Sequence, residues 1–270
     1  HNVFFSYSRG FKSGGWNANP DSLTFIPLAP TGTGGFPFTR NGVEGVIFDG
    51  REFDPEFSDN FELGWKSRML GGALRMNATL FHTNFSGYQL QTFTGQSFFI
   101  NNVPRVKSRG AELEFFAPHR SWLFVQGGVT YVDTRFGDHL GIPDIDEREG
   151  ERLPLAPAWS GSLGLLLDLP LFDTGWTLLG SSNIQYRGRS LTNSDLDSGK
   201  EQEHFTRSQL RLGLRSPEGR WEITAFAENI EDEVQGLYFD SPFQNGSLST
   251  FPSSPRFYGV TLRVGFGGPY

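Results

Sequence analysis

The chain of 270 residues has a formal net charge of -7, a mean hydropathy of -0.36 and 20% charged residues. The acidic balance argues against nucleic acid as the main partner, and no run approaches the 18 or more apolar residues of a membrane helix. The sequence contains no cysteine, which excludes a disulfide framework and a thiolate metal site. Its 34 glycines and 27 phenylalanines favour tight turns and aromatic girdles, as in a β-rich chain.

Alternation of apolar and polar residues with a period of two recurs along the chain and predicts strands with one apolar face. In the strand expected at 203–215, for example, Leu210, Leu212 and Leu214 lie opposite Gln209 and Arg211. We expect ten strands, at residues 2–11, 57–68, 73–93, 97–117, 122–135, 155–168, 176–189, 203–215, 220–231 and 254–266.

The connections between these strands alternate between short and long. The short ones, at 69–72, 118–121, 169–175 and 216–219, contain Gly, Pro or Ser, whereas those at 13–55, 135–153, 188–202 and 231–253 are long and polar. An antiparallel, up-and-down transmembrane barrel has short periplasmic turns and long extracellular loops. This count places both His1 and Tyr270 on the short-turn side.

Four tryptophans sit near predicted strand ends, where the amphipathic indole ring favours a membrane interface. They are Trp122, Trp159, Trp176 and Trp221. Together with the alternation, they favour a wall with lipid on its apolar side and a wet or protein-filled lumen on the other.

Six segments, in order along the whole chain, resemble TonB-dependent outer-membrane receptors of the siderophore-receptor type. They are 5–17 (FSYSRGFKSGGWN), 53–67 (FDPEFSDNFELGWKS), 106–114 (VKSRGAELE, with a Gly-x-Glu pattern), 153–157 (LPLAP), 227–232 (AENIED) and the closing strand 255–266 (PRFYGVTLRVGF). Each match alone is weak, but six in sequence are specific. The chain is identified as a member of this family.

The resemblance implies a multi-pass β-barrel in the outer membrane of a Gram-negative cell. Receptors of this kind have 22 strands and a plugged lumen, which needs about 600 barrel residues. Residues 1–270 are therefore expected to be the C-terminal portion of the barrel domain, with the plug and the N-terminal strands absent. The implied partners are outer-membrane lipid, the receptor's own plug, a TonB-type energy coupler and a scarce nutrient such as a ferric siderophore. Cobalamin, haem or a glycan stays open as the ligand.

Charged residues of the polar face supply the first site candidates. By strand parity, Arg75, Glu112, Glu114, Arg187, Arg211, Glu222, Glu228 and Arg263 point into the lumen, where they would meet the plug or form a solvated lining. Arg187 and Arg189 lie near the outer end of their strand. Their guanidinium groups could hold an anionic iron chelate through bidentate bonds, or form a structural pair in a loop.

Aromatic residues of the long loops supply a second group of site candidates. The first loop contains Trp16, Phe25, Phe36, Phe38 and Phe48. The alternation in the hairpin at 88–99 extends beyond the ~9–11 residues that a barrel strand needs to cross the bilayer. Trp16, Tyr88, Gln91 and Phe93 are candidate ligand-binding residues. The alternative is that these residues hold an extracellular cap together by packing on one another.

Signals for a metal, a cofactor or catalysis are poor. The acidic segment 144–151 (DIDEREGE) departs from calcium-loop spacing and favours a solvated loop, so no metal or cofactor is predicted. No H-E-x-x-H, G-x-S-x-G or phosphate-binding loop occurs, and His82 with Ser86 is the one conceivable catalytic pair. Two alternatives to the receptor stay open: a complete ten-stranded outer-membrane barrel enzyme (a protease or lipase), and a soluble β-rich binding domain.

Overall fold

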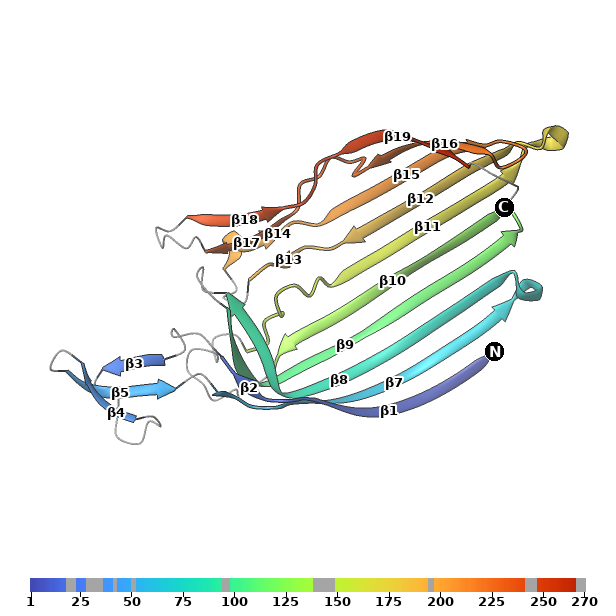
Figure 1. Ribbon diagram of the computed structural model, residues 1–270. Coiled ribbons are helices and arrows are strands. Elements are labelled where there is room, and N and C mark those ends of the chain that lie inside the picture. The colour runs from blue at the N-terminus through green and yellow to red at the C-terminus, as the bar shows by residue number, and fades with distance from the viewer. Residues whose placement is uncertain are drawn as a thin grey trace.

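One large antiparallel sheet dominates the protein (Figure 1). The computed structural model describes residues 1–17, 23–27, 36–40, 43–49, 52–93, 98–137, 149–193, 197–240 and 247–265. Within these residues, ten strands pair side by side, each with its neighbour in the chain-order series. In sheet order they are β1 (Asn2–Lys12), β7 (Glu56–Met69), β8 (Leu74–Phe93), β9 (Phe98–Arg120), β10 (Leu123–Phe136), β11 (Trp159–Pro170), β12 (Thr177–Arg187), β15 (Phe205–Arg215), β16 (Trp221–Glu228) and β19 (Phe257–Val264).

These ten strands correspond one to one to the predicted ones, with bounds that differ by a few residues, so the expected up-and-down antiparallel fold is confirmed. The largest difference at a strand start is in β11, which begins at Trp159 rather than at residue 155. Leu155 adopts a left-handed φ of 57° and donates its backbone N–H to the Leu191 carbonyl at 2.8 Å. Both features turn the chain away from the ladder before β11 begins.

The described residues include no helix long and apolar enough to span a bilayer.

Short and long connections lie at opposite ends of the sheet (Figure 1). The short ones include the 3₁₀ turns η2 (Leu70–Gly72) and η3 (Phe172–Thr174), and the N-terminus lies at this end. The long ones contain small strands that the alternation does not predict: β2 (Gly15–Trp16) with β6 (Glu52–Phe53), β3 (Leu23–Pro27), β4 (Phe36–Arg40) and β5 (Val43–Asp49) together, β13 (Ser190–Leu191) with β14 (Glu201–Gln202) after η4 (Ser198–Lys200), and β17 (Gly236–Asp240) with β18 (Leu248–Pro252). Tyr270 lies outside the described residues.

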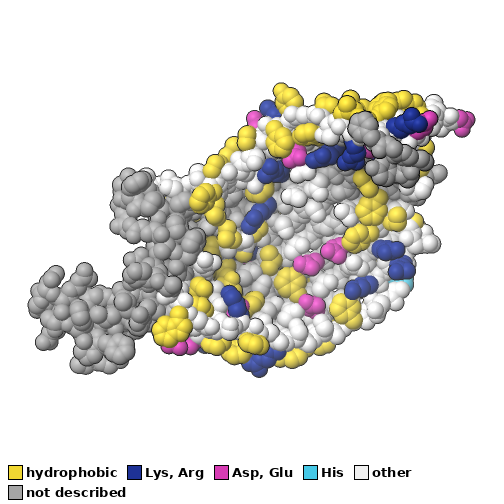
Figure 2. Space-filling model, in the orientation of Figure 1, with side chains coloured by type: hydrophobic (Ala, Val, Ile, Leu, Met, Phe, Trp, Pro, Cys, Tyr) yellow, Lys and Arg dark blue, Asp and Glu magenta, His cyan; other side chains and the backbone are white. Residues whose placement is uncertain are grey.

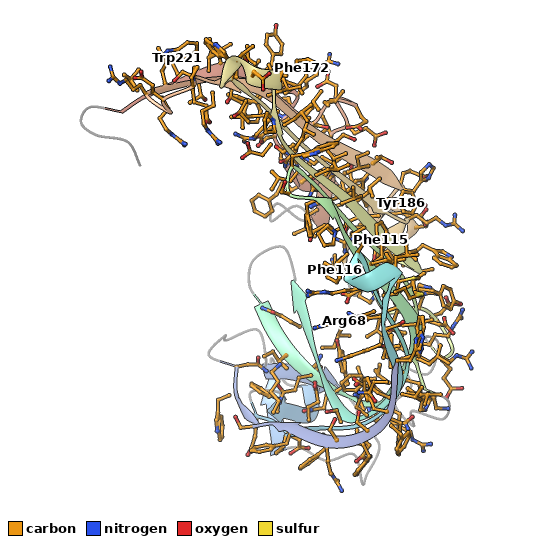
Figure 3. All side chains as sticks on the ribbon, turned by 90° about the vertical axis from the view of Figure 1, so that its right-hand side faces the viewer. Arg68, Phe115, Phe116, Phe172, Tyr186 and Trp221 are labelled. Atoms are coloured by element: carbon orange, nitrogen blue, oxygen red, sulfur yellow. The ribbon has the colours of Figure 1, made fainter. Side chains whose placement is uncertain are left out.

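The sheet curves into an open arc, seen from the short-turn end in Figure 3. Cross-strand partners point to the same side, so the register separates two faces. The convex face is apolar: Val3, Trp65, Ala78, Leu113 and Val129 follow one another across β1 and β7–β10. The concave face is polar, and Glu114 lies between Asn77 and Gly128 on it.

Gly110 is required by a close approach of two strands on the concave face. A Cβ at this position would lie 2.2 Å from the Tyr131 carbonyl oxygen and 2.6 Å from the Phe81 ring. The glycine of the Gly-x-Glu segment therefore lets β9 and β10 pair while an aromatic ring covers it.

The buried apolar cluster of the described residues lies at the long-loop end of the sheet, on β9, β10 and the chain that returns after β10. Val103, Val106, Phe136 and Leu153 are at most 5% exposed there. The far ends of β8 and β9 bend over the concave side at this end (Figure 3). The cluster thus joins the elongated β8–β9 hairpin to the chain that returns after β10.

Candidate functional site on the concave face

The concave face carries charged side chains of both signs, with hydrophobic side chains between them (Figure 2). Towards the long-loop end it is hollowed by a cavity of about 690 Å³. Side chains from five strands and two loops line this cavity, which we call the upper hollow. Its polar members include Glu112, Glu114, Thr130, Ser160, Ser162, Gln185, Arg187, Arg207 and Gln235.

Hydrogen-bond donors in the upper hollow are only partly satisfied. The Nε of Arg207 and the Nε2 of Gln235 are buried and find no partner among the described residues. Arg187, at the end of β12, donates from Nη2 to the Leu155 carbonyl at 3.0 Å. A buried donor without a partner costs stability, so a cavity that retains two of them suits a ligand rich in acceptor oxygens.

Ion pairs continue along the concave face towards the short-turn end. Arg211 on β15 contacts Glu228 on β16 at 3.0 Å. Arg215 lies 3.2 Å from Asp168 and 3.3 Å from Glu222. Glu222 is also 3.9 Å from an Nη atom of Arg263 on β19, the last strand of the sheet.

The predicted lumen-facing residues divide among these groups. Glu112, Glu114 and Arg187 line the upper hollow, and Arg211, Glu222, Glu228 and Arg263 belong to the ion pairs. Arg75 lines a second hollow at the short-turn end with Lys66, Arg68 and Phe116. Figure 3 labels Arg68 and Phe116. Whether any of them meets a plug stays a prediction.

Tyr88 lies in the packed base of the extracellular loops. Its ring contacts Phe85 edge-on, 5.4 Å between centroids, and both rings pack against the buried apolar cluster. Burial raises the pKa of the Tyr88 phenol, and the nearby Glu56 carboxylate raises it further. Next to it, Gln89 donates to the carbonyls of Ser13 and Asp54 at 2.9 and 3.0 Å, which ties the start and the end of the first long loop to β8.

The other predicted ligand residues lie around this base. Trp16 is 65% exposed in β2, and Gln91 is exposed in β8. The side chains of Phe25, Phe36, Phe38, Phe48 and Phe93 lie outside what the structure describes, as do residues 144–148 of the acidic segment. Arg189 points elsewhere than Arg187: it is exposed and pairs with Glu201 at 3.7 Å.

The two residues of the upper hollow with unpartnered buried donors, Arg207 and Gln235, were not among the predicted site residues. Arg207 could have been found, because it shares the inward parity of Gln209 and Arg211 on β15. Gln235 lies in a loop before β17, where no periodicity indicates the direction of a side chain.

The conceivable catalytic pair is not assembled. His82 lies on the convex face, and its Nε2 is 3.2 Å from the Asn84 Oδ1. Ser86 is four residues further along the same strand, about 13 Å away at ~3.3 Å per residue. Within the described residues, no group of three or more His, Cys, Asp or Glu side chains is placed to hold a metal ion.

The family model for the TonB-dependent receptor-like β-barrel matches residues 1–230. The chain belongs to the TonB-dependent receptor β-barrel family. It is therefore an outer-membrane β-barrel protein, which excludes the soluble binding domain. The family is one of transport receptors and not an enzyme family.

Named relatives within the TonB-dependent receptors agree with this assignment. The chain is 26% identical over 234 residues to the metal-pseudopaline receptor CntO of Pseudomonas aeruginosa strain PAO1, covering 85% of this chain and 30% of the relative. The same receptor of strain UCBPP-PA14 is 25% identical over 232 residues, covering 85% and 30%. The chain thus spans about a third of the length of the curated relatives it matches.

Solved structures share the fold. The ferric yersiniabactin uptake receptor FyuA of Yersinia pestis superposes with a TM-score of 0.70 at 18% identity, covering 98% of this chain and 35% of that one. The ferric-catecholate import receptor Fiu of E. coli K12 gives 0.63 at 17% identity, covering 96% and 32%. The copper transporter OprC gives 0.60 at 14% identity, covering 98% and 37%.

Proposed function

We propose that this chain forms part of a receptor that binds a metal chelate, most simply a ferric siderophore, and imports it across the outer membrane with energy from a TonB-type coupler. Family membership supports this, as do relatives whose names state a metal chelate as ligand. Transport needs no covalent step, so no catalytic residue or cofactor is assigned.

The observation that carries the ligand assignment is the set of donors in the upper hollow. Arg187 and Arg207 provide positive charge, and the unpartnered Nε of Arg207 and Nε2 of Gln235 provide two further hydrogen bonds. Chelators of ferric iron present anionic oxygens, which guanidinium groups bind through charge-assisted hydrogen bonds. Exposed Trp16 and Gln91, together with Arg189, would contact the ligand earlier, at the outer loops.

Substitution of the hollow's donors tests the ligand site. In the complete receptor, Arg207→Gln is expected to weaken binding at least tenfold, since a hydrogen bond to a charged group is worth about 1.5–3 kcal/mol. The measurement is uptake of radiolabelled iron from catecholate, hydroxamate and carboxylate chelates, with Arg187→Gln as a second variant. Arg220→Gln, in the exposed short turn between β15 and β16, removes the same charge outside the hollow. Equal uptake by Arg207→Gln and Arg220→Gln would refute the assignment.

We propose further that the ten strands are the C-terminal portion of a 22-stranded barrel that surrounds a plug. Edge strands β1 and β19 each pair on one side within the described residues, and such unpaired edges are not tolerated in a bilayer. Glu112, Glu114 and the ion-paired arginines would then face the plug. The intact mass of the native gene product, purified from membranes, is expected to be about 75–90 kDa for a 22-stranded barrel with a plug. A mass near the 30.2 kDa of this chain would instead indicate a closed ten-stranded barrel.

A further inference from the structure

Two parts of the concave face differ in how their cations are compensated. On β15, at the short-turn end, Arg211 pairs with Glu228 and Arg215 with Glu222. On β7 and β8, at the same end, three cations lack such partners. These are Lys66, Arg68 and Arg75, and among the described residues no carboxylate lies within ion-pair distance of any of them.

Arg68 and Arg75 are direct partners in the register of β7 and β8, and both side chains are exposed. The Cβ atoms of such a pair are about 4.5–5.5 Å apart, and like charges placed directly opposite each other destabilise a sheet. The Nζ atom of the neighbouring Lys66 lies 5.2 Å from the centre of the Phe4 ring, a contact that holds the ammonium without neutralising it. An anion bound between the two guanidinium groups would remove their repulsion.

The three cations line a hollow of about 690 Å³, which we call the lower hollow. It lies at the end of the sheet that faces the viewer in Figure 3. Phe116 is the register partner of Arg75, and Phe124 lies close by in the same lining. None of the described residues that line the lower hollow is acidic. Guanidinium groups beside aromatic rings suit an organic oxyanion with a planar part, since one ligand then meets both.

The lower hollow adjoins the upper hollow along β9. Glu114 lines the upper hollow and Phe116 the lower one, and they are consecutive inward residues, about 7 Å apart at ~3.3 Å per residue. In the described lining of the upper hollow, two glutamates offset two arginines, whereas that of the lower hollow carries three cations. An anionic ligand that moves from the upper to the lower hollow therefore moves towards positive potential.

We propose that the lower hollow is a second binding site for an anionic metal chelate, occupied after the chelate leaves the upper hollow and before it reaches the periplasm. Arg68 and Arg75 would bind its oxygens through bidentate, charge-assisted hydrogen bonds, and Phe116 would contact its planar part. This site rests on the proposed function, because it takes the same chelate as its ligand. It adds a step after recognition, with residues that neither the outer loops nor the upper hollow supplies.

Separate measurements of chelate binding and chelate uptake by the complete receptor test this site. The probes are radiolabelled ferric catecholate and ferric carboxylate chelates, both anionic. Binding is measured at equilibrium on cells deprived of energy, and uptake on energised cells at saturating chelate. Arg68→Gln with Arg75→Gln is expected to lower the maximal uptake rate at least tenfold, the factor for one lost charge-assisted hydrogen bond. The Kd of the de-energised cells is expected to stay as in the wild type, whereas Arg207→Gln in the upper hollow raises it.

Two further variants separate the role of charge from that of packing. Arg68→Lys with Arg75→Lys keeps both charges and is expected to retain most of the uptake. Arg220→Gln removes a charge in the short turn between β15 and β16, outside the lower hollow, and is expected to import as the wild type does.

The possible results separate this site from the proposed function. In a receptor that imports a chelate, unchanged uptake by the double glutamine variant would overturn the site alone, and so would an equal loss in the double lysine variant. Entry of a large antibiotic through the double glutamine variant would show that the cations hold a plug instead, and would overturn the site too. A wild-type receptor that neither binds nor imports either chelate would refute the proposed function and this site with it.

Discussion

Leu212→Arg tests the assignment of the convex face to lipid. On β15 the outward positions run Thr206, Ser208, Leu210, Leu212 and Leu214, so Leu212 is the centre of the apolar segment. Its neighbours in the register are Gly180 on β12 and Ala225 on β16, and neither carries a group that could pair with a guanidinium. The leucine side chain is 51% exposed in this protein, that is, open to the surrounding lipid.

An arginine near the bilayer midplane of a barrel costs about 2–4 kcal/mol, falling to about 0–1 kcal/mol near the interfaces. The central position of Leu212 selects the larger value, which is a large part of the 5–15 kcal/mol typical of a folded domain. The assay is urea unfolding of the complete receptor in lipid vesicles, followed by tryptophan fluorescence.

The matched control is Gln209→Arg, which places the same side chain on the concave face of the same strand. Gln209 lies opposite Glu228 in the register, so the added charge meets a carboxylate and should change the free energy of unfolding by less than about 1 kcal/mol. Leu212→Ala corrects for the loss of the leucine. If Leu212→Arg and Gln209→Arg have equal effects, the assignment of the two faces is refuted.

Three further predictions concern local structure. Gly110→Ala should lower the free energy of unfolding by about 1–3 kcal/mol, because the new methyl group overlaps the Tyr131 carbonyl. Phe136→Ala, in the buried cluster, should cost about 3–5 kcal/mol, measured as faster hydrogen exchange of the loop base. Burial disfavours the charged form of Glu231, but hydrogen bonds from Ser208 outweigh it and lower the pKa below its usual 4.5. Its stabilisation is present above about pH 4.5 and is lost as the pH falls, so Glu231→Gln should lower the melting temperature at neutral pH and leave it unchanged in acid.

Each of these has its own control. At Gly128 the added methyl would stop 3.2 Å from a backbone oxygen, so Gly128→Ala should cost less than the change at Gly110. The Phe11 ring is 77% exposed, and Phe11→Ala should leave exchange at the loop base as it is. A Glu231→Gln variant whose melting temperature falls equally at all pH values would contradict the ionic explanation.

The sequence predicts the large sheet well because a strand's side chains alternate strictly. A shift of one residue would move every leucine of β15 onto the polar concave face, so the burial pattern specifies the register. Short turns rich in Gly, Pro and Ser then fix the order of strands, and the structure has each strand beside its predecessor. Elements of two to seven residues inside the long loops, such as β13 with β14, are too short to show a period.

Strand parity predicts the direction of a side chain only as far as the strand continues. Arg187 and Arg189 have the same parity, and both would face the lumen if β12 continued. The strand ends at Arg187, where the Gly188 N–H bonds the Trp159 carbonyl at 2.8 Å and the chain leaves the sheet. Arg189 then pairs with Glu201 of the small β14, a partner that no alternation indicates. Arg207 lies within β15, where parity holds, so the same rule could have placed it in the upper hollow although it was not among the predicted residues.

Asp133 links the two surfaces that the protein presents at its long-loop end. Its carboxylate, on a side chain only 9% exposed, accepts from Arg109 and Arg135 on the convex face and from Arg152 at 2.8 Å. Arg152 directly precedes Leu153 of the buried cluster, whose N–H bonds the Thr134 carbonyl. One carboxylate among three guanidinium groups cannot neutralise them all, so the arrangement retains positive charge on the outer wall while it fixes the returning loop.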